Sequence, residues 1–211
     1  MKKSFLLLIS LFAWFAVIVQ WVLMYKNKTT DLAEMMVRFF SFFTILTNIL
    51  VALYFTRQLI FQRLPPWKHF NNPGILTAVT VYITVVGAVY QVALRHIWEP
   101  QGMQKLVDEL LHSIIPVLVI IFWIFYEQKQ ELKWKSIPVF LLYPLLYLAF
   151  ILVRGAFSGF YPYPFINVTD LGWPKVISNI ILLFSVFVIL FILFIGAGKL
   201  IARNKERKIP V

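Results

Sequence analysis

The chain has 211 residues, of which 61% are hydrophobic, 18% aromatic and only 14% charged. A soluble domain is about half apolar and about a quarter charged, so a globular fold of this length would expose more apolar surface than its core can bury. Composition therefore excludes a cytosolic enzyme, a disordered chain and a nucleic-acid-binding domain. The net charge of +11 is typical of basic residues that flank membrane spans. With no cysteine, the chain forms no disulfide, thiolate metal site or cysteine nucleophile.

Six segments are long and apolar enough to cross a bilayer, because a spanning helix needs about 20 mostly apolar residues. They are Ser4–Tyr25, Val37–Ile60, Ile75–Ile97, Leu106–Tyr126, Ile137–Val153 and Val176–Ala197. The fifth segment is short and contains Pro144. We therefore predict an all-α bundle of six transmembrane helices that forms a single domain over residues 1–211.

Basic residues indicate how this bundle is oriented. If the N-terminus is cytoplasmic, 13 lysines and arginines fall on the cytoplasmic side and 7 on the outer side. An excess of basic residues marks the cytoplasmic face of a membrane protein. We therefore predict that both termini are cytoplasmic.

Polar side chains gather in the outer half of the predicted membrane region. By helical rise, Thr44 and His112 each lie about 10 Å below the outer boundary, and Tyr90 lies in the same layer. Ser41, Thr44, Thr47 and Asn48 follow i, i+3, i+4 spacing on one helical face. Because polar groups in hydrocarbon are costly, this layer is the candidate functional site. The alternative is that these hydroxyls bond back to their own helix or join neighbouring helices.

His112 is the only histidine within a predicted span. Asp108 precedes it by four residues on the same helical face, where a carboxylate could hold the imidazole tautomer. Alternatively, Asp108 marks the start of a helix, where acids interact favourably with the dipole. Pro116 follows His112 by four residues and cannot donate to its carbonyl, so we expect the helix to kink there.

The segment 154–175 is too long for a plain turn. Its prolines and its aromatic residues Tyr161, Tyr163 and Phe165 predict an outer lid or re-entrant loop, with an interfacial anchor as the alternative. Arg154 at its base is suited to bind a lipid carboxylate or phosphate, or else to snorkel or to pair with Asp170.

Several short strings in the chain resemble a known family. The strings are Phe43-Thr44-Ile45-Leu46-Thr47-Asn48, Leu111-His112-Ser113-Ile114-Ile115-Pro116, Tyr143-Pro144-Leu145-Leu146-Tyr147, Arg154-Gly155 and Tyr161-Pro162-Tyr163-Pro164-Phe165. Together they resemble small bacterial integral membrane proteins grouped with the androgen-induced and androgen-dependent membrane proteins of animals. The animal members are intramembrane threonine hydrolases that cleave fatty acid esters of hydroxy fatty acids. The resemblance implies a multi-pass protein of the bacterial cytoplasmic membrane, with Thr44 as nucleophile and His112 as the second essential residue; Thr47, one turn away, is the alternative nucleophile.

A threonine hydroxyl needs a base within hydrogen-bond reach to act as a nucleophile, and a neutral imidazole can supply it. Asn48, Tyr90 and Arg154 are candidates to stabilise the oxyanion. The expected partners are a lipid or fatty acyl ester substrate and membrane lipids, with no nucleic acid, cofactor or metal; the sequence leaves the oligomeric state open. The rival interpretation is a non-enzymatic lipid-binding or transport bundle in which His112 is a structural or ligand contact.

Overall fold

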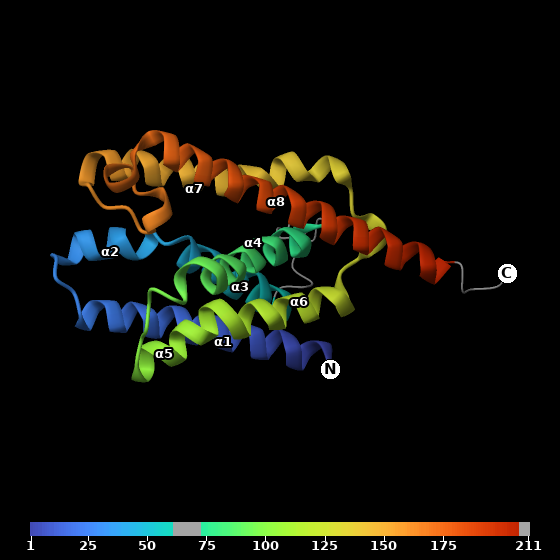
Figure 1. Ribbon diagram of the computed structural model, residues 1–211. Coiled ribbons are helices and arrows are strands. Elements are labelled where there is room, and N and C mark those ends of the chain that lie inside the picture. The colour runs from blue at the N-terminus through green and yellow to red at the C-terminus, as the bar shows by residue number, and fades with distance from the viewer. Residues whose placement is uncertain (61–72, 207–211) are drawn as a thin grey trace. The chain divides into compact units, whose positions relative to one another are not determined.

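The computed structural model describes residues 1–60 and 73–206, and every regular element in these ranges is helical (Figure 1). Six helices are long and apolar enough to cross a membrane: Lys2–Lys26, Phe43–Ile60, Ile75–Leu94, Gly102–Tyr126, Trp134–Ser158 and Val168–Asn204. The prediction of an all-α chain with six such helices is confirmed. Four basic residues behind the orientation argument, Arg63, Lys68, Arg207 and Lys208, lie outside the described residues. The orientation stays a prediction.

The helices form two compact units, an N-terminal unit of residues 1–128 and a C-terminal unit that starts at Lys129. The expectation of a single domain stays a prediction. The N-terminal unit contains α1 (Lys2–Lys26), α2 (Leu32–Phe40), α3 (Phe43–Ile60), α4 (Ile75–Val89), the π-turn η2 (Tyr90–Leu94), α5 (Gly102–Glu109), the π-turn η3 (Leu110–Ile114) and α6 (Ile115–Tyr126). In this unit α1 packs along α3, and α4 packs against both α3 and α6.

The predicted second span, Val37–Ile60, is wrong in its first part because the chain breaks between α2 and α3. The backbone N–H of Ser41 donates to the Arg38 carbonyl at 3.0 Å, and its hydroxyl donates to the Val37 carbonyl at 2.6 Å. These bonds close a tight turn and end the α-helical ladder. Thr44 is thus the second residue of α3, and the depth that we inferred by counting from Val37 does not apply to it.

Two π-turns interrupt the helices that carry Tyr90 and His112. Each closes an i to i−5 hydrogen bond, from Arg95 N–H to the Tyr90 carbonyl at 2.8 Å and from Ile115 N–H to the Leu110 carbonyl. Pro116 has no N–H to donate to the His112 carbonyl, so the regular ladder cannot continue there. We predicted a kink beside His112, and the structure shows a π-turn at that point. Such π-turns occur frequently at functional sites.

Hydroxyl groups join α1 to α3 in the apolar interior of the N-terminal unit. The hydroxyls of Ser10 and Thr56 lie 2.6 Å apart, and the Trp14 indole N–H donates to Thr56 Oγ1 at 2.9 Å. Thr56 thus takes part in two interhelical hydrogen bonds.

We expect Thr56→Val to lower the free energy of unfolding by about 1 kcal/mol, because interhelical hydrogen bonds in membrane proteins are worth about 0.6 kcal/mol each. Thr56→Ser, which keeps the hydroxyl, should lose less. Unfolding of the full chain in mixed micelles by increasing denaturing detergent measures both. Equal losses in the two variants would show that the missing methyl or shape, rather than the hydrogen bonds, decides the effect.

The C-terminal unit contains α7 (Ile137–Ser158), the 3₁₀ turn η6 (Pro164–Ile166) and α8 (Val168–Glu206). Pro144 lies inside α7 without ending it. Most of the predicted loop 154–175 is helical, so its boundaries were wrong: α7 runs on to Ser158, and α8 starts at Val168 with one non-helical residue, Gly172. The early start of α8 has a local cause, because the Asn167 side chain accepts from Thr169 N–H at 3.0 Å and caps the helix.

Candidate functional site

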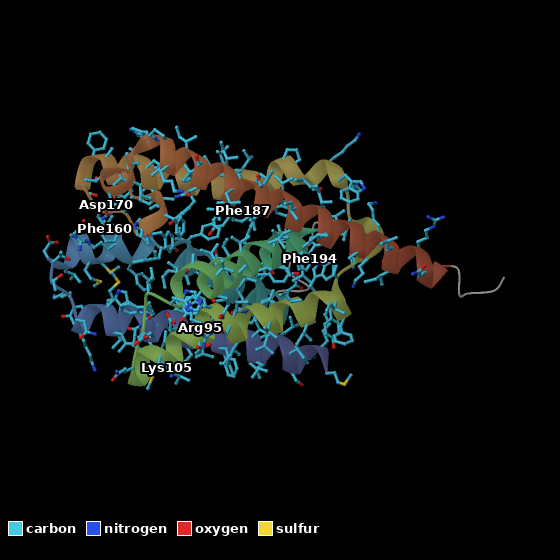
Figure 2. The ribbon with its side chains drawn as sticks, in the orientation of Figure 1. Arg95, Lys105, Phe160, Asp170, Phe187 and Phe194 are labelled. Carbon is cyan, nitrogen blue, oxygen red and sulfur yellow. The ribbon has the colours of Figure 1, made fainter. Side chains whose placement is uncertain are left out.

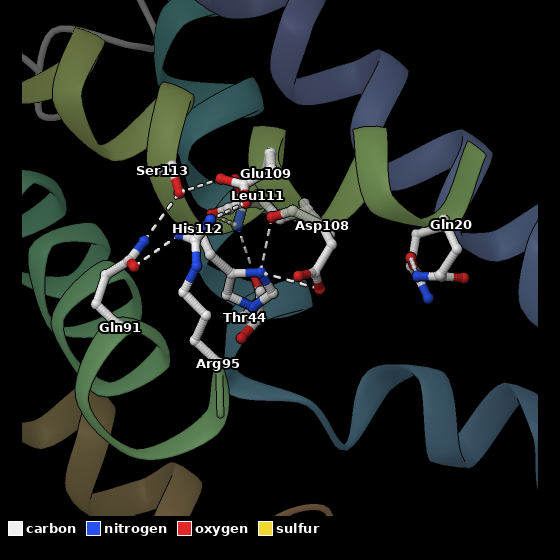
Figure 3. Close-up of polar contacts among 11 residues, drawn as sticks. Gln20, Thr44, Gln91, Arg95, Asp108, Glu109, Leu111, His112 and Ser113 are labelled. Atoms are coloured by element: carbon white, nitrogen blue, oxygen red, sulfur yellow. Dashed lines mark hydrogen bonds and ion pairs between the residues drawn. The ribbon is translucent and has the colours of Figure 1, made fainter. Parts of the chain in front are cut away.

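The imidazole of His112 contacts Asp108, one turn earlier on the same helix, through its Nδ1 atom (Figure 3). Its Nδ1 lies 2.9 Å from the Asp108 backbone carbonyl and 3.3 Å from the carboxylate Oδ1. A carbonyl oxygen only accepts, so Nδ1 must carry the proton and donate it. Neutral His112 therefore has an unprotonated Nε2, and Nε2 makes no hydrogen bond with any of the described residues.

Asp108 is nearly buried, with a side chain 8% exposed against 11% for His112. The alternative interpretation, an acid at the start of a helix, is wrong because α5 already starts at Gly102. The second carboxylate oxygen, Oδ2, has no hydrogen-bond partner among the described residues.

Tyr90 covers one face of the His112 ring. The two ring centroids lie 4.2 Å apart and the planes are inclined by 16°, a stacked arrangement. Tyr90 is itself only 3% exposed. The stack brings together residues from η2 and η3, so both π-turns contribute to one site.

Asn48 links α3 to the backbone beside His112. Its Nδ2 donates to the Thr44 carbonyl at 2.9 Å and to the Leu111 carbonyl at 3.4 Å. Both partners are acceptors, so the amide orientation is fixed by chemistry and both of its N–H groups are in use. This arrangement argues against the oxyanion role that we considered for Asn48 and makes it a link between helices.

The two candidate nucleophiles lie at the start of α3. Thr44 is 8% exposed and Thr47 is fully buried. The Asn48 amide donates to the backbone carbonyls of both Thr44 and Leu111, so it links the start of α3 to the residue that precedes His112. In the view of Figure 3, the Thr44 side chain lies below the imidazole, on the side away from Asp108. The choice of Thr44 over Thr47 stays a prediction.

A closed ring of polar side chains that the sequence analysis missed lies between the two π-turns. Gln91 donates to Ser113 Oγ at 2.9 Å, Ser113 donates to Glu109 Oε2 at 2.7 Å, and Arg95 contacts Glu109 Oε1 at 2.5 Å and Gln91 Oε1 at 2.8 Å. Figure 3 shows these four side chains beside His112. The i, i+4 spacing of the pairs Gln91–Arg95 and Glu109–Ser113 was the available sequence signal.

Arg154 and the predicted lid residues belong to the C-terminal unit. Arg154 is buried, and it donates to the Phe160 carbonyl at 3.3 Å and lies 4.7 Å from the Phe160 ring centroid. Figure 2 shows Phe160 and Asp170 at one end of this unit; Asp170 bonds to Asn167. The rings of Tyr163 and Phe165 stack with centroids 5.2 Å apart.

The segment between α7 and α8 is also tied to the second of these helices, because the Asn179 side chain donates to the Phe165 carbonyl at 2.8 Å. The lid function of Tyr161, Tyr163 and Phe165, and the oxyanion and lipid-binding roles of Arg154, stay predictions.

The fold and site define a class: an all-α chain with six helices able to cross a membrane and a nearly buried Asp–His pair. Within the described ranges, no group of three or more histidine, aspartate or glutamate side chains is placed to hold a metal ion. No family model, curated protein or solved structure matches the chain. The resemblance drawn from short strings therefore stays a prediction.

Proposed function

We propose that the protein is an intramembrane hydrolase of lipid esters, in which Thr44 is the nucleophile and His112 the general base. The observation that carries the proposal is the commitment of His112 Nδ1 to Asp108, which leaves Nε2 as a basic nitrogen with no partner among the described residues. This division of roles between the ring nitrogens is the one that a base in nucleophilic catalysis requires.

The proposed reaction has two halves. Thr44 Oγ1 attacks the ester carbonyl carbon while its proton passes to His112 Nε2, and the imidazolium then gives that proton to the departing alcohol oxygen as the C–O bond breaks. Water, deprotonated in the same way, then cleaves the acyl-threonine to a free fatty acid and restores the hydroxyl. The Asp108 carboxylate stabilises the imidazolium in both halves.

The surroundings support an apolar substrate. The helices that carry Thr44 and His112 are long and apolar, so an acyl chain can approach them from the bilayer. Esters of fatty acids are neutral at the reacting carbonyl and need no cationic pocket. The family resemblance supports the same substrate class.

A fluorophosphonate probe tests the proposal, because it reacts covalently with activated hydroxyl nucleophiles. We expect the purified full chain in detergent to form one adduct, mapped to Thr44 by mass spectrometry and lost in Thr44→Ala and His112→Gln. Thr80→Ala is the matched control, because Thr80 is a buried threonine whose hydroxyl donates to the Leu76 carbonyl of its own helix, away from His112. This control should label as the wild type does.

Labelling of Thr47 instead of Thr44 would support the hydrolase and identify Thr47, one helical turn away, as its nucleophile. No adduct on a folded sample, together with no hydrolysis of fatty acyl esters, would overturn the proposal. It would favour the rival, a lipid-binding or transport bundle in which His112 is a contact residue.

A further inference from the structure

The ring formed by Gln91, Arg95, Glu109 and Ser113, here called the polar ring, closes across the two π-turns. Two of its members, Arg95 and Gln91, come from the end of the helix that carries Tyr90, and the other two come from the helix that carries His112. Its four contacts lie between 2.5 and 2.9 Å. No member of the polar ring touches His112 through a hydrogen bond.

The polar ring and the Tyr90–His112 stack are built from sequence neighbours. Tyr90 precedes Gln91, and His112 precedes Ser113. The first residue of each pair enters the stack, with ring centroids 4.2 Å apart, and the second enters the hydrogen bond that joins the turns at 2.9 Å. Any shift of one turn against the other must therefore change both contacts together.

Arg95 contacts the stack as well as the polar ring. Its guanidinium carbon lies 5.8 Å from the Tyr90 ring centroid, on the ring that covers His112. The Arg95 and Glu109 side chains are 43% and 28% exposed, and ion pairs this exposed contribute little to stability. The polar ring instead fixes the position of one π-turn relative to the other. Each of its four side chains makes at least two contacts, and together these contacts restrict the movement of both turns.

The geometry points to Arg95 and Glu109 as positioning residues, which hold the two π-turns in register so that Tyr90 stays stacked on His112 and Nε2 keeps its direction. The catalytic consequence rests on the proposed hydrolase function, whereas the positioning itself does not. Removal of the polar ring should change the environment of the imidazole even in a protein that performs no hydrolysis.

Nuclear magnetic resonance of the full chain in micelles, with ¹⁵N-labelled histidine, tests the positioning directly. The chain has three histidines, and His112→Gln identifies the resonances of His112. Stacking on Tyr90 shifts the imidazole protons by ring current, and Tyr90→Leu gives their unstacked position. We expect Arg95→Leu and Glu109→Leu to move the His112 protons most of the way to that position, and Arg95→Lys to move them less.

Arg38→Leu is the matched control, because Arg38 forms an ion pair of 2.7 Å with Glu34 on α2 and both side chains are 30% exposed. This variant should leave the His112 resonances unchanged. If Arg95→Leu and Glu109→Leu also leave them unchanged in folded protein, the polar ring does not position the imidazole and the inference is overturned.

Ester hydrolysis supplies a second readout. We expect Arg95→Leu to lower kcat about tenfold with little change in KM, because a misdirected base slows proton transfer rather than binding. A wild-type protein without hydrolysis would overturn the proposed function, and the resonance comparison would still decide the positioning.

Discussion

His112→Gln is expected to reduce kcat for fatty acyl ester hydrolysis by about 10²–10⁴-fold, the usual contribution of a general base. Glutamine is polar and of similar reach, yet it has no basic nitrogen to take the Thr44 proton. The stack on Tyr90, 4.2 Å between ring centroids, would also be lost. The measurement is initial-rate hydrolysis of a fatty acyl ester in mixed micelles, with protein folding checked by its thermal transition.

His96→Gln is the control for this substitution, because His96 is exposed and is not part of the site. It should hydrolyse the ester at the wild-type rate. Unchanged hydrolysis by His112→Gln would remove histidine from the mechanism and, with it, the proposed hydrolase.

Asp108→Asn should cost less than the histidine substitution. In the Ser-His-Asp triad the same change costs about 10⁴-fold, because the imidazole is left in the wrong tautomer. Here the backbone carbonyl of residue 108 accepts from Nδ1 at 2.9 Å and would hold the tautomer without the carboxylate. The substitution then removes only the stabilisation of the imidazolium by the carboxylate. We expect kcat to fall about 10–100-fold, which raises the activation barrier by about 1.4–2.7 kcal/mol at about 1.36 kcal/mol for each factor of ten. A loss as large as that of His112→Gln would show that the carboxylate, and not the carbonyl, sets the tautomer.

The helices could be predicted from the sequence because one property, the length of apolar runs, decides them. Apolar runs do not reveal where the backbone hydrogen bonds of a helix are interrupted. The break at Ser41 lies between phenylalanines, so hydropathy continues smoothly across a turn that depends on two hydrogen bonds of one residue. At residues 154–175 the polar and proline residues suggested a loop where much of the chain is helical. Such residues lie within the helices there as well as between them.

Part of the candidate site could be predicted because its members contrast with their surroundings. His112 and Asp108 are polar residues next to an apolar run, and their i, i+4 spacing indicated the contact that the structure shows as one of two alternatives, the other being an acid at a helix start. The contacts of Arg95 were missed because a basic residue at the end of a membrane span is already accounted for by the charge bias that orients the bundle. Its role depends on Glu109, 14 residues away on another helix, and pairings between helices follow from packing rather than from spacing.

Gly155→Ala is expected to destabilise the C-terminal unit, because an added Cβ has closer contacts here than at Gly159, Gly172 or Gly196. A Cβ at this position would lie 2.1 Å from Tyr161 Cε1 and 2.3 Å from Cζ, far inside the contact distance of carbon atoms. The aromatic ring must therefore leave its place against α7 or α7 must bend. Overpacking of this kind costs about 1–3 kcal/mol, and we expect a loss in this range, measured as a lower unfolding midpoint in micelles.

Gly196→Ala is the matched control, because Gly196 also lies in a long helix of this unit and the nearest atom to its added Cβ is on the Trp134 ring at 3.6 Å, an ordinary contact. Alanine is the better helix former by up to about 1 kcal/mol, so this variant should be neutral or more stable. If both substitutions destabilise equally, loss of glycine in general rather than the Tyr161 contact is responsible.

A double-mutant cycle with Tyr161→Ala assigns the cause to one contact. Tyr161→Ala alone loses the packing of the ring and should lower stability. In that background the atoms that a new Cβ would meet are gone, so Gly155→Ala should become neutral or stabilising, as it is in an unobstructed helix. Such a change of sign is a coupling of the kind that neighbouring residues show and that distant, independent residues do not. Additive losses in the double variant would mean that Tyr161 does not lie against Gly155, and that the segment between α7 and α8 is held by its other contacts, such as the Asn179 hydrogen bond to Phe165.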